Sequence, residues 1–203
     1  MRLFQKRGTG CGLLVLVLLL LLAGWLFWGA YPFLARHAPV VSDLLVIEGS
    51  LDDDVLEQAA GWAASNGVEQ IYLTGGPIAV GSYLVAWNSL PEMTKARMEA
   101  LDLGGQFDLQ AVPADKVRRG RTRASARALK AELNLERGAF NLASEGPHTR
   151  RSWRTFQQVF GDGVAVGSVA LTPTAYNHHD WWSCSEGVRN MIGEAIAYVV
   201  ELF

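Results

Sequence analysis

The chain has 203 residues, of which 18 are Lys or Arg and 20 are Asp or Glu, and half of all residues are hydrophobic. With a mean hydropathy of +0.13 it is too apolar for a disordered chain, and its length corresponds to about one domain. The charge is unevenly distributed, because residues 1–36 carry four basic side chains and no acidic one, which leaves a net charge of −6 on residues 37–203. This acidic remainder argues against general nucleic-acid binding, so we expect no nucleic-acid partner.

An uncharged segment over residues 8–35 includes ten consecutive positions, 13–22, that are only leucine or valine. Roughly 20 helical residues cross the hydrocarbon core of a bilayer, so we expect a transmembrane helix over residues 12–35. A cleavable signal has a shorter apolar region and ends at a small-x-small site. Here Ala23 and Gly29 are each followed two positions later by a bulky aromatic residue, so we expect a retained anchor.

Basic residues define the expected orientation of this helix. Three of them precede it, whereas only Arg36 closely follows it. The positive-inside rule therefore predicts that residues 1–11 are cytoplasmic, that residues 36–42 are a linker and that residues 43–203 form an exported domain. In a bacterium the chain would be a single-pass protein of the inner (plasma) membrane with a periplasmic or extracytoplasmic domain, and the lipid bilayer would be its first partner.

After residue 42, short apolar runs alternate with helical patterns. The runs predict strands over residues 44–47, 71–73, 107–112, 139–143 and 164–171. The helical patterns cover residues 51–66, 91–103, 122–133, 149–160 and 186–203. Parallel strands need crossover connections, so the alternation predicts a Rossmann-like three-layer α/β/α fold with a mainly parallel sheet. The last helix carries one apolar stripe, from which we expect an amphipathic covering helix.

Ligands of open parallel sheets bind outside the carboxyl ends of the strands. The most unusual segments of this sequence follow the expected strands, at residues 48–50, 74–77, 116–127, 144–148 and 172–180. Because all of these segments should meet at one edge of the sheet, the sequence predicts a ligand pocket there.

Several residues in these segments are candidates for binding an anion. Gly75 and Gly76 would allow backbone N–H groups to approach a ligand closely, although a tight turn explains a glycine pair equally well. Arg121 and Thr122 lie where a loop opens a helix, with Thr122 as the expected N-cap. A helix N-terminus favours a phosphate or a carboxylate. For the other basic residues around them, a solvated face or a contact with anionic lipid is the alternative.

His148 and Arg151 are expected in the first turn of the helix that follows the fourth strand. An imidazole transfers protons near neutral pH, and a guanidinium binds an oxyanion through two hydrogen bonds. We therefore assign proton transfer to His148, with Glu48 or Glu194 orienting it, and ligand binding to Arg151 and Ser144. A capping histidine with exposed arginines is the alternative.

No metal and no cofactor is assigned from the sequence. His178 and His179 have the composition of a metal site, but no further ligand stands at helical spacing from them. The sequence also lacks the Gly-x-Ser-x-Gly, Walker and Gly-x-Gly-x-x-Gly motifs.

Read in order, these segments resemble the SanA/ElyC/YdcF family of bacterial envelope proteins. The resemblance covers residues 42–203. It rests on residues 43–49 (DLLVIEG), 73–76 (LTGG), Arg121-Thr122 with Ala126, 147–152 (PHTRRS) and Glu194 in 193–198 (GEAIAY). The chain departs from the family pattern at Ser152, where alanine is usual, and at Glu48, where many members have an apolar residue.

The resemblance implies an N-terminal span, a Rossmann-like domain outside the membrane and a role in envelope biogenesis, peptidoglycan-precursor or lipid-carrier handling. Combined with the candidate residues, it favours an anionic small molecule or lipid-linked phosphate as ligand. If the site is catalytic, phosphoryl or glycosyl-phosphate transfer or hydrolysis suits it best. Two alternatives stay open. One is a non-catalytic scaffold or sensor that recruits cell-wall synthesis proteins, and the other is an enzyme with a nucleotide-type cofactor.

Overall fold

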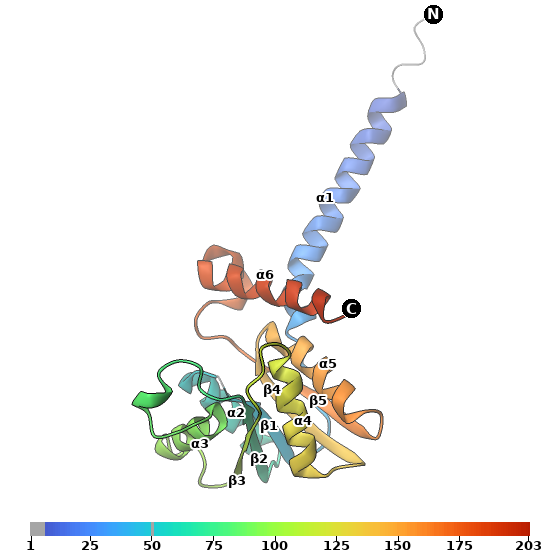
Figure 1. Ribbon diagram of the computed structural model, residues 1–203. Coiled ribbons are helices and arrows are strands. Elements are labelled where there is room, and N and C mark those ends of the chain that lie inside the picture. Colours follow the sequence, from blue (N-terminus) through green and yellow to red (C-terminus); the bar gives the residue numbers. More distant parts are fainter. Residues whose placement is uncertain (1–6, 50) are drawn as a thin grey trace, which may run out of the picture.

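Five parallel strands form one sheet, and helices cover both of its faces (Figure 1). The computed structural model describes residues 7–49 and 51–203. The strands are β1 (Leu44–Glu48), β2 (Gln70–Gly75), β3 (Asp108–Pro113), β4 (Gly138–Glu145) and β5 (Val164–Leu171). Their order, β3-β2-β1-β4-β5, confirms the expected Rossmann-like α/β fold.

Each face of the sheet has its own hydrophobic core. The helices of the domain are α2 (Asp53–Ser65), α3 (Leu90–Ala100), α4 (Arg121–Leu133), α5 (His148–Phe160) and α6 (Ser185–Val200). In β1, Leu45 and Ile47 belong to the core beneath α2 and α3, whereas Leu44 and Val46 belong to the core beneath α4 and α5. Every residue of this short apolar run is therefore buried in one core or the other, because successive side chains of a strand point to opposite faces.

The order of the strands reverses between β1 and β4. From β1 the chain continues to β2 and β3 on one side, and it then returns to place β4 and β5 on the other side. Glu48 ends β1 and Glu145 ends β4, so both lie at the topological switch point of the sheet. This is the position where ligands bind in sheets of this type.

Helix α1 (Arg7–Leu34) projects away from the α/β domain (Figure 1). Its segment Gly12–Leu34 is long and apolar enough to cross a membrane. The most apolar stretch of this segment is not buried inside the molecule. Leu34, at its end, packs into a small hydrophobic core with Tyr176, Trp181 and Met191. The expected orientation depends in part on Arg2 and Lys6, and these two residues lie outside the described residues. Ser50, in the loop after the first strand, also lies outside them.

The segment that follows α1, residues 36–42, is held against the sheet. Ala38 forms an antiparallel bridge to β5, and the side chain of Asn141 both accepts from the backbone N–H of Val40 and donates to its carbonyl oxygen, each at 2.8 Å. A Cβ atom at Gly167 would overlap the Asn141 side-chain oxygen, so glycine is required there. These contacts fix how the apolar helix leaves the domain.

Helix α6 lies across the carboxyl edge of the sheet and runs crosswise to α1 (Figure 1). It packs on α1, α5 and the short helix η2 (His178–Ser183) instead of on a face of the sheet. The expectation that its apolar stripe covers the domain is wrong. Of that stripe only Met191 is buried, and Ile196 and Val200 are 60% and 67% exposed. The inner face packs Met191 against the end of α1 and also carries Glu194 toward the charged first turn of α5.

Candidate functional site

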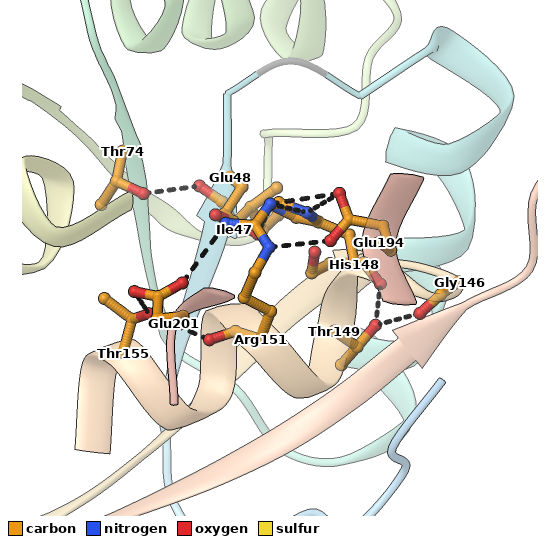
Figure 2. A network of polar contacts seen from close by, with 11 residues as sticks. Ile47, Glu48, Thr74, Gly146, His148, Thr149, Arg151, Thr155, Glu194 and Glu201 are labelled. Carbon is orange, nitrogen blue, oxygen red and sulfur yellow. Dashed lines mark hydrogen bonds and ion pairs between the residues drawn. The ribbon is translucent and has the colours of Figure 1, made fainter. Parts of the chain in front are cut away.

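Five charged side chains from three elements meet beside the switch point (Figure 2). Helix α5 supplies His148 and Arg151, the end of β1 supplies Glu48, and the C-terminal segment supplies Glu194 from α6 and Glu201 just after it. We call these five residues the charge cluster. The cluster brings together the expected proton-transfer residue, both of its expected orienting carboxylates and the expected anion-binding arginine.

A tight turn between β4 and α5 places His148 over the strand ends. Gly146 has φ +44°, a left-handed conformation that favours glycine, and a Cβ atom there would crowd Pro173. The hydroxyl of Thr149 then donates to the carbonyl oxygens of Ser144 and Gly146, at 3.1 and 2.8 Å. Because α5 begins immediately after this turn, its first residue, His148, projects toward the end of neighbouring β1.

The imidazole of His148 lies between two carboxylates. Its Nδ1 is 2.9 Å from Glu194 Oε1, and its Nε2 is 3.5 Å from Glu48 Oε2. Arg151 holds the same Glu194 carboxylate with Nε at 2.8 Å and Nη2 at 3.1 Å, and its Nη2 lies 2.8 Å from His148 Nδ1. With the imidazole protonated, Nδ1 donates to Glu194, so this carboxylate is the shared counter-ion of two adjacent cations.

These contacts shift the pKa values of the cluster strongly. Burial alone lowers the pKa of His148, but the charge of Glu48 and the hydrogen bond to Glu194 outweigh it and raise the pKa to about 10. Burial raises the pKa of Glu194, but hydrogen bonds from His148 and Arg151 outweigh it and lower the pKa to about 2. For Glu48 the charge on His148 likewise overcomes burial and holds its pKa below the ordinary value. At neutral pH all three groups are charged.

Glu201 extends the cluster toward α4. It accepts a hydrogen bond from the hydroxyl of Thr155 at 2.8 Å and lies 3.7 Å from Arg151 and 3.8 Å from Arg123. None of these three contacts follows from the sequence interpretation. A usable signal was present, since Glu201 stands seven residues after Glu194 and therefore on the same side of the last helix.

Three buried polar atoms in and beside the cluster have no hydrogen-bond partner in the described structure. They are Glu48 Oε2 and the hydroxyl oxygens of Ser144 and Ser152. Both hydroxyls lie near the Glu48 carboxylate. The ligand-binding role expected for Ser144 stays a prediction.

Gly75 is the last residue of β2, and Gly76 connects it to Pro77, which forms an antiparallel bridge to Ser89. The carbonyl oxygens of the two glycines accept hydrogen bonds from the backbone N–H groups of Ala114 and Leu90, at 2.8 and 3.0 Å. A Cβ atom at Gly75 would lie 3.2 Å from the Cβ of Leu90, so close packing accounts for one of the two glycines. A ligand-binding role for the pair stays a prediction.

Thr122 is not the N-cap of α4. Gly120 takes that position with φ +67°, and Arg121 and Thr122 are the first two helical residues. Within the described part of the chain, neither makes a hydrogen bond or an ion pair with the charge cluster, whereas Arg123, one position further, contacts Glu201. Anion binding by Arg121 and Thr122 also stays a prediction.

Two surface cavities lie away from the cluster. One, of about 320 Å³, is lined by α3 and the start of β3, and the other, of about 410 Å³, lies beside residues 39–43 and Trp62. Over residues 7–49 and 51–203 no group of three or more His, Cys, Asp or Glu side chains is arranged to hold a metal ion.

The fold and the site together define a doubly wound α/β protein with a charge cluster at its switch point and a helix of membrane-spanning length. No family model matches the chain, and no curated protein matches it. Membership of the SanA/ElyC/YdcF family is therefore a prediction that rests on the short segments described above.

Proposed function

We propose that this chain is a single-pass protein of the bacterial inner membrane, and that its extracytoplasmic domain supports cell-envelope biogenesis by binding an anionic, phosphate-bearing small molecule or lipid at the charge cluster. The observation that carries the proposal is the convergence of His148 and Arg151 on one carboxylate, that of Glu194, at the switch point. The resemblance to the SanA/ElyC/YdcF family supports the envelope role and the lipid-carrier or peptidoglycan-precursor class of ligand.

The Glu194 carboxylate marks where an oxyanion binds. Its two oxygens accept from Arg151 Nε and Nη2 and contact His148 Nδ1 at distances between 2.8 and 3.1 Å. A phosphate group presents the same oxygen geometry with more negative charge, so it competes for this pair of cations. Glu194 then acts as an internal counter-ion that a ligand displaces.

The protonation states suit chemistry on a phosphate ester. When a phosphate ester displaces Glu194, water or an acceptor hydroxyl attacks phosphorus and loses its proton to solvent, and the bond from phosphorus to the leaving oxygen breaks. His148 gives that oxygen its Nδ1 proton, while Arg151 stabilises charge on the phosphoryl oxygens. The deprotonated Glu48, on the opposite ring nitrogen, orients the imidazole and stabilises its charged form. These residues accordingly fit hydrolysis or transfer of a phosphoryl or glycosyl-phosphate group.

Titration calorimetry on the full chain in detergent tests the binding step, with inorganic phosphate and farnesyl phosphate as probes. We expect Arg151→Ala to weaken binding by about 10- to 100-fold, as the loss of charged hydrogen bonds predicts. The isosteric Glu194→Gln removes the competing charge and should tighten binding. Arg119→Ala, at an exposed position outside the cluster, is the matched control. Unchanged affinity in both Arg151→Ala and His148→Ala would exclude the site.

The envelope role is tested in cells whose growth depends on the protein. Cells carrying His148→Ala or Arg151→Ala should lose barrier function, measured as sensitivity to detergent, at a temperature below the unfolding midpoint of each purified variant, whereas cells carrying Arg119→Ala should not. If both variants are folded and support a normal envelope, the scaffold alternative gains and the binding site has no role there.

A further inference from the structure

Helix α6 is amphipathic in the opposite sense to an ordinary covering helix. Its inner face carries the Glu194 carboxylate toward the charge cluster, while its outer face is apolar. The exposed side chains of that outer face are Ile192 at 52%, Ile196 at 60%, Val199 at 52% and Val200 at 67%, followed by Leu202 and Phe203. Arg189 and Glu186, which pair with each other, are the charged residues on its exposed first turns. An apolar face directed away from the domain implies that something apolar covers it.

The position of α6 relative to α1 identifies what covers this face. The 23 residues Gly12–Leu34 extend about 34 Å as a helix, close to the thickness of a hydrocarbon core of about 30 Å. Ala30, Tyr31 and Leu34, at the end of that length, pack in the same core as Met191 of α6. Because α6 runs crosswise to α1 at this level (Figure 1), it lies where the spanning helix leaves the bilayer.

Aromatic and basic side chains at the same level agree with a membrane interface. The rings of Trp28 and Trp182 are 4.8 Å apart, and both are exposed. The guanidinium of Arg150 lies 4.0 Å above the ring of Phe33 and also bonds to that residue's carbonyl oxygen. Tryptophan and arginine at the end of a span are typical of the headgroup region.

From these observations we infer that α6 is a second membrane contact, whose outer face lies in the boundary between headgroups and acyl chains of the leaflet from which α1 emerges. The inference rests on the part of the proposed function in which α1 spans a membrane. An interfacial helix needs an apolar face and a polar face, and α6 has both, with the polar one directed at its own domain.

Membrane contact by α6 specifies the ligand class of the charge cluster. Glu194 and Glu201 project from the inner side of this helix, so the cluster lies about one helix diameter, roughly 10 Å, below the interface. A phosphate-bearing lipid headgroup of the same leaflet is then the ligand that reaches His148 and Arg151, in preference to a solute free in water.

Depth measurements on the full chain in phosphatidylcholine vesicles test the membrane contact. The background carries Cys11→Ser and Cys184→Ser, and serine at 184 can keep the N-cap that the cysteine sulfur provides to Gly187. A fluorophore is then attached at Ile196→Cys or Val200→Cys, with Asp54→Cys, at an exposed position of α2, as the control. We expect brominated lipids to quench the first two labels several-fold more than the control, and aqueous iodide to quench them several-fold less.

Two results would overturn the inference. One is iodide quenching at Ile196→Cys and Val200→Cys as strong as at Asp54→Cys. The other is protection from iodide that disappears when the protein is diluted in lipid, which would identify a second copy of the chain as the cover. Retention of the protein in vesicles after alkaline carbonate washing is measured in parallel, so a failure of the α1 anchor is distinguished from a failure of α6 alone.

Discussion

His148 and Glu194 have opposite pKa shifts that together define a pH window for the stability of the domain. The pKa of His148 is raised from 6.5 to about 10, so its contribution is complete below pH 6.5 and is lost as the pH rises toward 10. The pKa of Glu194 is lowered from 4.5 to about 2, so its contribution is complete above pH 4.5 and is lost as the pH falls toward 2. Both contributions are therefore complete only between about pH 4.5 and 6.5.

We expect the thermal unfolding midpoint of the detergent-solubilised chain to be highest within that window and to fall progressively between pH 6.5 and 10. In His148→Gln the alkaline decrease should become shallower, because the group whose proton is lost is gone. Circular dichroism at a series of pH values provides the measurement, with His179→Gln, on exposed η2, as the matched control. Equal alkaline decreases in the wild type and in His148→Gln would contradict the assignment of this pKa.

At the same scale, the sequence located part of the charge cluster and missed the rest for a physical reason. His148 and Glu48 directly follow or end apolar runs, so knowledge of parallel sheets places them at one edge. Glu201, Thr155 and Arg123 meet only because the last helix crosses that edge, and local periodicity contains no information about such a crossing.

Among the elements, strands and central helices were predictable because burial on both faces leaves a continuous apolar run, as in β1 and β5. The orientation of α6 was not predictable. Its periodicity shows that one face is apolar, but it does not say whether protein or lipid covers that face. The expectation that the apolar stripe of α6 covers the domain was wrong for this reason, since Ile196 and Val200 are exposed.

The segment of residues 36–42 provides a prediction about the attachment of α1 to the domain. Asn141→Ala removes both hydrogen bonds to Val40 at a position only 1% exposed, so we expect a loss of about 1–3 kcal/mol in the free energy of unfolding. Trypsin should also cut faster after Arg36, whose guanidinium lies 4.0 Å above the ring of Trp153 in the intact structure.

Gel analysis of timed digests and denaturant titration supply the two measurements for this segment. Asn66→Ala is the matched control, because the side chain of Asn66 is exposed and bonds only locally, to the carbonyl oxygen of Trp62. If both alanine variants are cut at the wild-type rate, the segment is flexible and does not fix the direction of α1.

For the molecule as a whole, the two parts of the sequence differ in charge and in hydropathy. The first 36 residues are basic and apolar, and residues 37–203 carry a net charge of −6. In the structure these parts meet at one level, where the end of α1, the tryptophans of residues 181 and 182 and helix α6 pack together. The charge cluster of this acidic domain lies beside that level, which is why we propose a ligand at the membrane.

The orientation of the chain is the prediction that belongs to this scale. Arg2, Lys6 and Arg7 precede the span and a single basic residue, Arg36, closely follows it, so the N-terminus should stay in the cytoplasm. Alkaline phosphatase, which is active only outside the cytoplasm, should be active when fused through a flexible linker after Phe203. A β-galactosidase fusion at the same point should be inactive, and activity there would place the domain in the cytoplasm. Replacing the three leading basic residues by glutamate should reduce the phosphatase signal, because the charge difference that holds the N-terminus inside is then reversed, whereas Arg119→Glu, in the exported domain, should leave it unchanged.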